Sequence, residues 1–273
     1  MTLPTIWHVP DELWNIIFPL LDELDPPRRR GRRRIPPRPI LEAIIFRLRT
    51  RCQWNHLPKE FPDASTVHRT WERWIRIGTF PRIWSALTAA CEERGGLDWT
   101  WQAADGAMGK ARFGGDLIGP NPTDRGKSGV KRSLLVEANG GPLAVIIAGA
   151  NVHDTKLLDA TFASIIVERP NPTPEQPQHV CLDKGYDNPT GHTAVEKYGY
   201  LPHIRRIGEE KLDEKQEKCY PARRWVVERT LAWLSKCREL LVCYDTKSEN
   251  FLALIQLACS LLWYRRFYHL NLR

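Results

Sequence analysis

The sequence lacks the features that mark secreted, zinc-binding or membrane proteins. Its seven cysteines are odd in number, include no C-x-x-C pair and follow no secretory signal, so we expect reduced thiols and no zinc site. The longest apolar stretch, 251–264, contains Gln256 and Ser260 and is shorter than the roughly 20 residues that a membrane span needs. No internal repeat is visible. These absences predict a cytoplasmic protein without a membrane partner.

The charge balance points to a polyanionic partner. Lys and Arg total 40 against 32 Asp and Glu, which gives a net charge of +8 and an isoelectric point near 9.2. A basic excess suits a partner such as nucleic acid, although many basic proteins bind none. The first third of the chain, 1–95, holds 16 basic and 11 acidic residues, a net of +5. Most of the excess charge is therefore concentrated there.

Residues 1–95 form the first expected domain and are predicted to be helical. Apolar residues recur at helical spacing over 11–24 and again over 40–51. Between these two helices, the segment 26–37 places six arginines between two pairs of prolines, which no helix passes through. This segment is either a solvated linker or an arm that lies along DNA phosphates.

A basic helix follows in the same region. Asp63 is its expected N-cap, and the helix should run to Gly78. Helix, short helix, turn and basic helix form a helix-turn-helix pattern, in which three arginines would contact DNA: Arg69, Arg73 and Arg76. The alternative is an ordinary bundle in which Trp71 and Trp74 pack inward and the arginines face water. We predict the helix-turn-helix, because a bundle alone has no reason to concentrate arginines beside its second helix.

Residues 96–273 form the second expected domain, in which the hydrophobic period changes. A strong hairpin signal, Asn139-Gly140-Gly141, joins two apolar runs, and Asp154 is the expected cap of a following helix. The predicted order is strands 98–104, 133–138 and 142–148, helix 155–167, strand 179–183, helix 190–197, strand 201–205, and two long helices over 221–240 and 251–264. This order predicts a mixed sheet flanked by helices in an α/β domain.

Three acidic residues stand where chemistry could use them. Asp105 and Asp183 are each expected at the end of an apolar strand, where α/β sheets place ligand groups. Glu228 lies in a predicted helix beside its apolar stripe, so it should face the sheet. Carboxylates suit magnesium, and two such ions about 3.5 to 4 Å apart can activate the attacking oxygen and neutralise the leaving oxygen at a phosphodiester.

Spacing alone does not select these acids. An aspartate after a strand is more often a turn former or a helix cap than a ligand. Four other acidic residues suit such ordinary roles: Asp124, Asp154, Asp187 and Glu137. Nothing in the spacing separates Asp183 from Asp187, so the assignment needs a further observation.

Several stretches, in order along the chain, resemble one known family. They read GPNPTDRGK at 119–127, LLV at 134–136, GANVHD at 149–154, DKGY at 183–186 and WVVERTLAWL at 225–234. Together they resemble bacterial insertion-sequence transposases of the DDE class, in the group known as family five. The similarity runs from about residue 40 to residue 268.

The resemblance implies a ribonuclease H-like catalytic domain and assigns Asp105, Asp183 and Glu228 as its catalytic, metal-binding triad. It also implies Mg²⁺ as the cofactor, for which Mn²⁺ can substitute, and the terminal inverted repeats of a mobile element as the substrate. Basic residues in or near the matching stretches are expected to hold the DNA: Lys127, Arg224, Arg229 and Lys236.

The chain departs from the family around the last acid. Related transposases show Tyr, two residues, Arg, three residues, Glu, six residues and Lys. Arg224 keeps its distance to Glu228, whereas Tyr220 is one residue too far away and Lys236 is one residue late. The short gap between 201 and 221 leaves no room for a large inserted domain, so we expect a compact catalytic core.

We therefore expect a nucleoid-associated DDE transposase that cleaves double-stranded DNA at the element's ends and transfers it to target DNA. Paired ends imply at least two protomers. One alternative is a nuclease of the same fold that cuts without joining. A second is a transposase-derived DNA-binding protein without catalysis, against which the three acids argue. A third possibility is that the basic first region serves only dimer contact.

Overall fold

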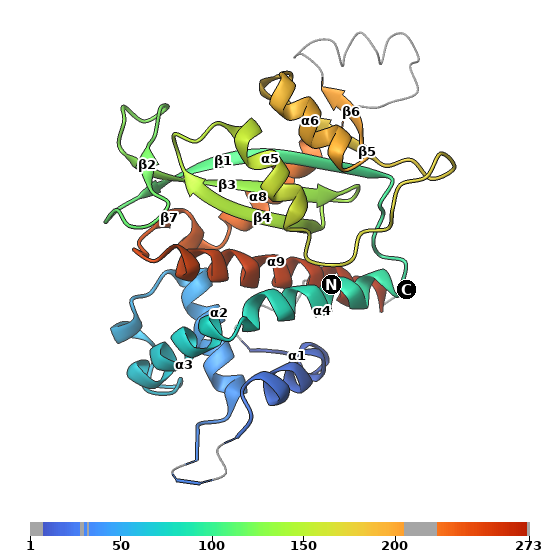
Figure 1. Cartoon of the computed structure of the whole chain (residues 1–273). Coiled ribbons are helices and arrows are strands. Elements are labelled where there is room, and N and C mark those ends of the chain that lie inside the picture. Colours follow the sequence, from blue (N-terminus) through green and yellow to red (C-terminus); the bar gives the residue numbers. More distant parts are fainter. Residues whose placement is uncertain (1–7, 28–29, 32, 205–222, 272–273) are drawn as a thin grey trace.

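The computed structural model describes residues 8–27, 30–31, 33–204 and 223–271. Figure 1 shows a twisted sheet above a long helix, α9 (Ser248–Leu270), with the N-terminal helices packed below that helix. The mixed α/β class expected from the sequence is confirmed. None of the described helices is long and apolar enough to cross a membrane.

The N-terminal region is helical, as predicted. It consists of α1 (Asp11–Leu24), α2 (Pro37–Thr50), the single turn η1 (Trp54–His56), α3 (Ala64–Arg76) and α4 (Thr79–Glu92). The bounds of α1 coincide with the predicted helix. Helix α2 begins three residues earlier than predicted, because Pro37 occupies its first turn, where a missing N–H costs nothing.

The cap of α3 is the one expected from the sequence. The Asp63 carboxylate accepts hydrogen bonds from the backbone N–H groups of Ser65 and Thr66 at 3.0 and 3.3 Å. Gly78, with a φ of +70°, separates α3 from α4. Trp71 and Trp74 are buried, so the tryptophans of α3 form its inner face while Arg69 and Arg76 remain exposed.

The sheet has the strand order of a ribonuclease H-like fold. Strands β1 (Trp101–Ala111), β3 (Ser128–Glu137) and β4 (Pro142–Gly149) form an antiparallel meander, and β5 (His179–Leu182) and β6 (Leu201–Ile204) extend it parallel to β1. The order across the sheet is β4-β3-β1-β5-β6. Two short strands pair at the margins, β2 (Gly119–Pro120) with β3 and β7 (Val242–Cys243) with β1.

Helices cover both faces of this sheet (Figure 1). On one face lie α5 (Asp154–Ala163) and α6 (Pro189–Lys197), and on the other lie α8 (Trp225–Ser235) and α9, with the single turns η2 (Lys184–Tyr186) and η3 (Arg238–Leu240) in the connections. Neighbouring residues of β3 show the two faces. Ser133 bonds to Thr161 of α5, whereas Arg132 donates to the Leu240 carbonyl of η3.

Several predicted boundaries and one predicted cap were wrong. Strand β3 begins at Ser128 rather than at 133, α5 ends at Ala163 rather than at 167, and α9 runs over Ser248–Leu270 rather than 251–264. Strand β1 continues six residues past Asp105, because β3 pairs with it as far as Lys110. The predicted helix 221–240 is shorter, since α8 ends at Ser235 and the chain turns through η3 into β7. Asp154 does not cap α5. The His153 ring accepts from the Thr155 N–H instead, and Asp154 is the first residue of the helix.

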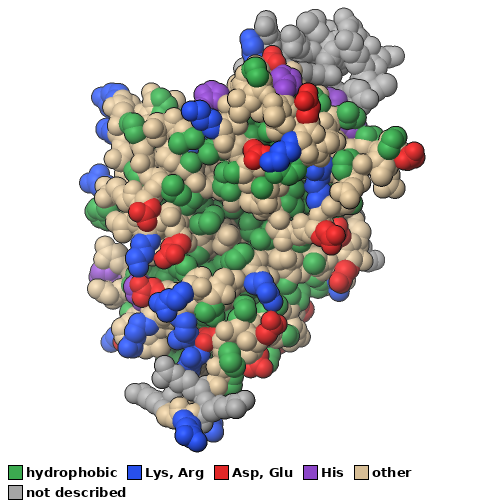
Figure 2. Space-filling model, viewed as in Figure 1, with side chains coloured by type: hydrophobic (Ala, Val, Ile, Leu, Met, Phe, Trp, Pro, Cys, Tyr) green, Lys and Arg blue, Asp and Glu red, His purple; other side chains and the backbone are tan. Residues whose placement is uncertain are grey.

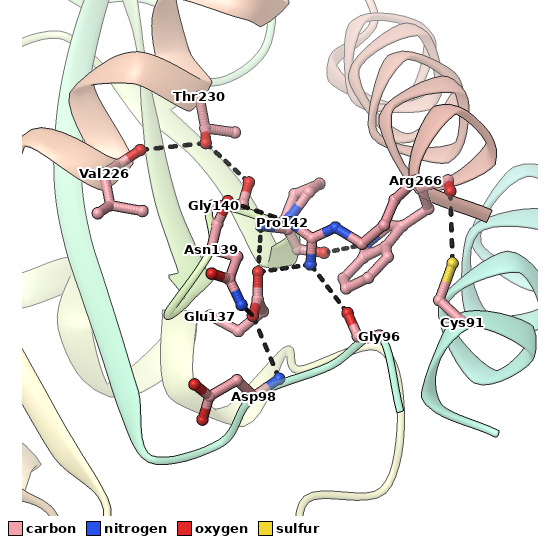
Figure 3. Close-up of polar contacts among 12 residues, drawn as sticks. Cys91, Gly96, Asp98, Glu137, Asn139, Gly140, Pro142, Val226, Thr230 and Arg266 are labelled. Atoms are coloured by element: carbon pink, nitrogen blue, oxygen red, sulfur yellow. Dashed lines mark hydrogen bonds and ion pairs between the residues drawn. The ribbon is translucent and has the colours of Figure 1, made fainter. Parts of the chain in front are cut away.

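The helical region and the sheet are joined by a shared core around the β3–β4 turn. The indole N–H groups of Trp84 on α4 and Trp263 on α9 both donate to the carbonyl of Pro142. The Cys91 thiol of α4 donates to the backbone carbonyl of Trp263 (Figure 3). A division into domains at residue 95 stays a prediction, but these contacts indicate that neither part keeps its core intact without the other.

Candidate active site

The sheet brings Asp105 and Asp183 together. Parallel pairing sets Ala103 of β1 opposite Cys181 of β5. Asp105 and Asp183 each lie two residues beyond this pair, Asp183 directly after the end of β5, and they are close enough for the charge of Asp183 to act on Asp105. The Asp183 side chain also accepts from the Gly185 N–H at 2.7 Å, which fixes it at the start of η2.

This pairing leaves Asp105 in an electrostatically strained state. Burial and the neighbouring charge of Asp183 raise the pKa of Asp105 to about 6, while a hydrogen bond from the Gly106 N–H at 2.7 Å acts in the opposite direction. A carboxyl with so raised a pKa, half-buried beside a second carboxylate, is typical of a functional site. A cation bound between the two acids would stabilise their charged forms against burial and against their mutual repulsion.

Glu228 is presented by α8, on the same face of the sheet as Asp105. Val226, Val227 and Thr230 anchor this helix in the core, while the Glu228 side chain is 50% exposed. Its carboxylate is paired with Arg224, one turn earlier, at 3.1 Å. The Arg224 charge also lowers the pKa of Asp105, so the start of α8 lies within electrostatic reach of the aspartate pair.

The three predicted ligands do not yet form one metal centre. Within the described parts of the chain, no three His, Cys, Asp or Glu side chains are close enough together to hold a metal ion. The donor set nevertheless fits a hard divalent cation, since all three groups are carboxylates and two are already adjacent. Glu228 would have to exchange Arg224 for the cation to complete the set.

Sequence reasoning missed three residues next to the aspartates. Asp154, treated as a helix cap, lies against β1 so closely that a Cβ at position 106 would overlap its carboxylate. Lys131, which is buried in β3, holds one oxygen of Asp154 at 2.9 Å. The Tyr186 phenol is 1% exposed, and the charges of Asp154, Asp105 and Asp183 reach it. The glycine after Asp105 and the tyrosine after Asp183 were the available sequence signals.

The arginines predicted to bind DNA from α3 differ in their surroundings. The Arg76 side chain is exposed and has no hydrogen bond or ion pair within the described chain, whereas the Arg69 guanidinium donates to the carbonyl and the hydroxyl of Ser65 in its own helix. Arg73 is engaged: its guanidinium donates to Asp25 at 2.7 and 3.0 Å. Arg34 pairs with the same carboxylate, so Asp25 ties the end of the arginine-rich segment to α3.

Basic side chains gather over this helical part. They stand at the lower left of the face shown in Figure 2, beside α2 and α3. A pocket of about 850 Å³ opens between α1, the segment 33–37 and α3. Four arginines contribute to its lining: Arg33, Arg34, Arg69 and Arg73. The pocket lies in the helical region rather than beside the aspartates.

The basic residues predicted to hold DNA around the catalytic domain also divide into side chains without a partner in the described chain and side chains that are engaged. Lys127 and Lys236 are exposed, and their side chains make no hydrogen bond or ion pair within the described residues. Arg224 is paired with Glu228. Arg229 donates to the Asn139 carbonyl at 2.8 Å and stacks on the rings of Trp225 and Trp233. Tyr220 lies outside the described residues.

The fold and the site together define a ribonuclease H-like enzyme with one acidic residue on the central strand β1 and a second directly after β5. The chain belongs to the DDE transposase family: residues 94–263 match the family described as "Transposase DDE domain". Residues 9–84 match a second family, described as "Putative transposase of IS4/5 family". The resemblance found in the sequence is thus confirmed, and with it the enzyme class.

Two proteins of Burkholderia cepacia are similar to this chain. The "Putative transposase for insertion sequence element IS402" is 36% identical over 154 residues, which cover 55% of this chain and 70% of that protein. The "Insertion element IS402 uncharacterized 16.2 kDa protein" is 32% identical over 119 residues, which cover 42% of this chain and 80% of that protein.

One solved structure, "Crystal structure of the Mos1 mariner paired end complex with Mn", aligns over 95% of this chain and 86% of its own. The identity is 10% and the TM-score is 0.28. A score this low carries no argument, so the ribonuclease H-like assignment rests on the strand order and the family match.

Proposed function

We propose that this transposase binds the terminal inverted repeats of its mobile element, cleaves DNA there and joins the freed 3′ ends to target DNA. The adjacency of Asp105 and Asp183, with Asp105 held partly buried against a like charge, is the observation that carries the proposal. An acidic pair kept together against its own repulsion suits a cation-binding role better than a structural one.

Asp105, Asp183 and Glu228 would hold the divalent cations, with Mg²⁺ as the metal and Mn²⁺ as a substitute. When bound, such ions activate the attacking oxygen and neutralise charge on the leaving oxygen. Arg224 has two roles in this scheme. Arg224 pairs with Glu228 in the structure. Once Glu228 turns toward the aspartates, the Arg224 guanidinium is free to hold a DNA phosphate beside them.

The remaining basic residues would position the DNA. Arg69, Arg73 and Arg76 on α3 are the proposed end-recognition residues, and Lys127, Arg229 and Lys236 would contact the backbone around the catalytic face. Arg76, Lys127 and Lys236 are the readiest of these, because they are exposed and unpaired within the described chain. Since two ends must be joined in one event, we propose a homo-oligomer of at least two protomers on DNA.

The test compares two neighbouring aspartates. Asp183→Asn removes a proposed metal ligand, whereas Asp187→Asn changes an exposed aspartate paired with His192 on the far side of η2. With duplexes bearing the element's ends and Mg²⁺, we expect Asp183→Asn to abolish cleavage while end binding, measured by gel retardation, survives. Asp187→Asn should cleave like the unchanged chain. Unchanged cleavage by Asp183→Asn would refute the assignment.

Joining is tested separately from cleavage. Labelled, pre-cleaved ends with a free 3′-hydroxyl are incubated with the full chain, Mg²⁺ and a supercoiled target plasmid. We expect labelled end–plasmid products, which the Asp183→Asn variant should not form. Efficient cleavage without any joined product would instead favour a nuclease that cuts without joining.

A further inference from the structure

A second polar group lies behind the aspartate pair, on the opposite face of β1. Asp105 is opposite Leu134 and therefore faces α8, whereas the next residue, Gly106, faces α5. The Asp154 carboxylate occupies the space where a side chain at 106 would begin. Gly106 also donates its N–H to Asp105. Asp154 therefore contacts the residue next to the proposed ligand, from the opposite face of β1.

Lys131 fixes one half of the Asp154 carboxylate and leaves the other half free. The ammonium group, only 6% exposed, lies 2.9 Å from Oδ2. The Oδ1 atom is buried and accepts no hydrogen bond from any described residue. A carboxylate oxygen that is buried without a donor costs free energy, so a hydrogen bond to Oδ1 from a bound group would be favourable.

Tyr186 supplies an independent observation that points to the same place. Its side chain is 1% exposed and its hydroxyl has no hydrogen-bond partner among the described residues. The charges of Asp154, Asp105 and Asp183 all act on this phenol and, together with burial, raise its pKa. The buried hydroxyl thus lies within electrostatic reach of three acidic side chains and donates to no described residue.

We propose that Asp154 and Tyr186 are positioning residues of the cation site, with Lys131 as their anchor: the free Oδ1 and the phenol hydroxyl bind water molecules that a divalent cation keeps. Magnesium usually retains several of its waters when a protein binds it, and groups that hold such waters fix the geometry of the direct ligands. A water bound to a cation donates its hydrogens, and both the phenol oxygen and the carboxylate oxygen can accept them.

This inference rests on the proposed function, because it presumes a cation at Asp105 and Asp183. It assigns Lys131, Asp154 and Tyr186 to the support of that cation rather than to DNA contact. It also gives Gly106 a role. Any larger residue there would drive Asp154 out of its place, so Gly106→Ala should act on the cation site without altering a carboxylate.

Binding of Mn²⁺ to the full chain without DNA, followed by electron paramagnetic resonance of the free ion, tests the inference apart from catalysis. Tyr186→Phe keeps the ring and removes only the hydroxyl. We expect its Mn²⁺ dissociation constant to rise roughly 10-fold, and that of Asp154→Asn to rise roughly 10- to 100-fold. The thermal midpoint of metal-free Tyr186→Phe should not fall, since the hydroxyl has no described partner to lose.

The matched control is Asp159→Asn. Asp159 is also an α5 aspartate paired with a lysine, Lys197 at 2.6 Å, but this pair is exposed. We expect its Mn²⁺ affinity to match that of the unchanged chain. If Tyr186→Phe and Asp154→Asn bind Mn²⁺ within twofold of the control, the inference is overturned. Should Asp154→Asn fail to fold, Tyr186→Phe decides alone.

The Asp183→Asn variant separates this inference from the proposed function. Loss of Mn²⁺ binding in Asp183→Asn with normal binding in Tyr186→Phe rejects only the positioning role. Normal Mn²⁺ binding in Asp183→Asn, or no saturable binding by the unchanged chain, rejects the proposed cation site itself and the inference with it.

Discussion

Two carboxylates on neighbouring strands of the same sheet have opposite surroundings. Glu137 at the end of β3 is fully buried and saturated with partners, which include Arg266 at 2.7 Å and the backbone N–H groups of Gly141 and Asp98 (Figure 3). Asp105 on β1 is half-buried and accepts one hydrogen bond, from its neighbour Gly106. The two carboxylates thus differ most clearly in the number of groups that bond to them.

The contrast distinguishes an acid that stabilises the fold from one whose oxygens remain available to the proposed cation. Glu137 closes the β3–β4 turn and ties it to α9 through Arg266, whose guanidinium also reaches the carbonyls of Gly96 and Asn139 (Figure 3). The lone pairs of Asp105 are not satisfied in this way. Substituting each acid by its amide should therefore affect different properties of the protein.

The largest expected effect is on catalysis by Asp105→Asn. An amide cannot serve as an anionic metal ligand, so we expect cleavage of end-bearing duplexes in Mg²⁺ to fall by roughly 1,000-fold or more, beyond the 10- to 100-fold typical of supporting residues. The free energy of unfolding, measured with urea in the absence of metal, should not fall, because a desolvated charge is removed. A destabilised Asp105→Asn with normal cleavage would reverse the comparison.

Glu137→Gln should behave in the opposite way. Removing one partner of a buried ion pair leaves Arg266 without its counter-charge, which costs about 3 kcal/mol of unfolding free energy. Urea unfolding measures this loss. In the fraction of the variant that is folded, cleavage per molecule should stay near that of the unchanged chain, since Glu137 pairs with Gln102, three residues along β1 from Asp105, and its partners are Arg266 and the turn rather than the aspartate pair.

The pH dependence of stability should distinguish Asp105 further. Its pKa rises from 3.8 to about 6 on folding, so the folded chain binds this proton more tightly than the unfolded chain. Stability should therefore fall as the pH rises from about 4 to about 6, and then level off. Metal-free Asp105→Asn should lack this fall. Parallel curves of unfolding free energy against pH for the two proteins would contradict the raised pKa.

The sequence predicted the order of the main helices and strands, whereas the assignment of Asp105, Asp183 and Glu228 stays a prediction and their surroundings were not predicted. The hairpin at Asn139-Gly140-Gly141 and the Asp63 cap follow from local chemistry, which is why they were predictable. Beyond Asp105 the length of β1 depends on pairing with β3, whose partner residues lie 19 to 27 positions further along the chain, so the predicted end at Asp105 was wrong.

The roles of individual acids were the least predictable part. Glu137 and Asp154 were grouped together as ordinary acids, because spacing shows neither the Arg266 pair nor the contact with Gly106. Both contacts arise only when distant segments meet. The resemblance to transposases selected Asp105 and Asp183, but the matching stretch at 149–154 did not reveal that Asp154 would lie behind them.

The smallest expected effects apply the same distinction to two arginines of α3. Arg73 is saturated by Asp25, whereas Arg76 is exposed and unpaired within the described chain. Arg73→Ala should cost about 1.5 kcal/mol of unfolding free energy, because it deprives a carboxylate of two hydrogen bonds.

Arg76→Ala should change stability by less than about 0.5 kcal/mol but lower the salt dependence of DNA binding by about one unit of slope. Retardation assays over a range of salt concentrations measure that slope. An unchanged slope for Arg76→Ala together with a reduced slope for Arg73→Ala would show that DNA displaces Asp25, and that a saturated charge in this protein can still serve as a ligand.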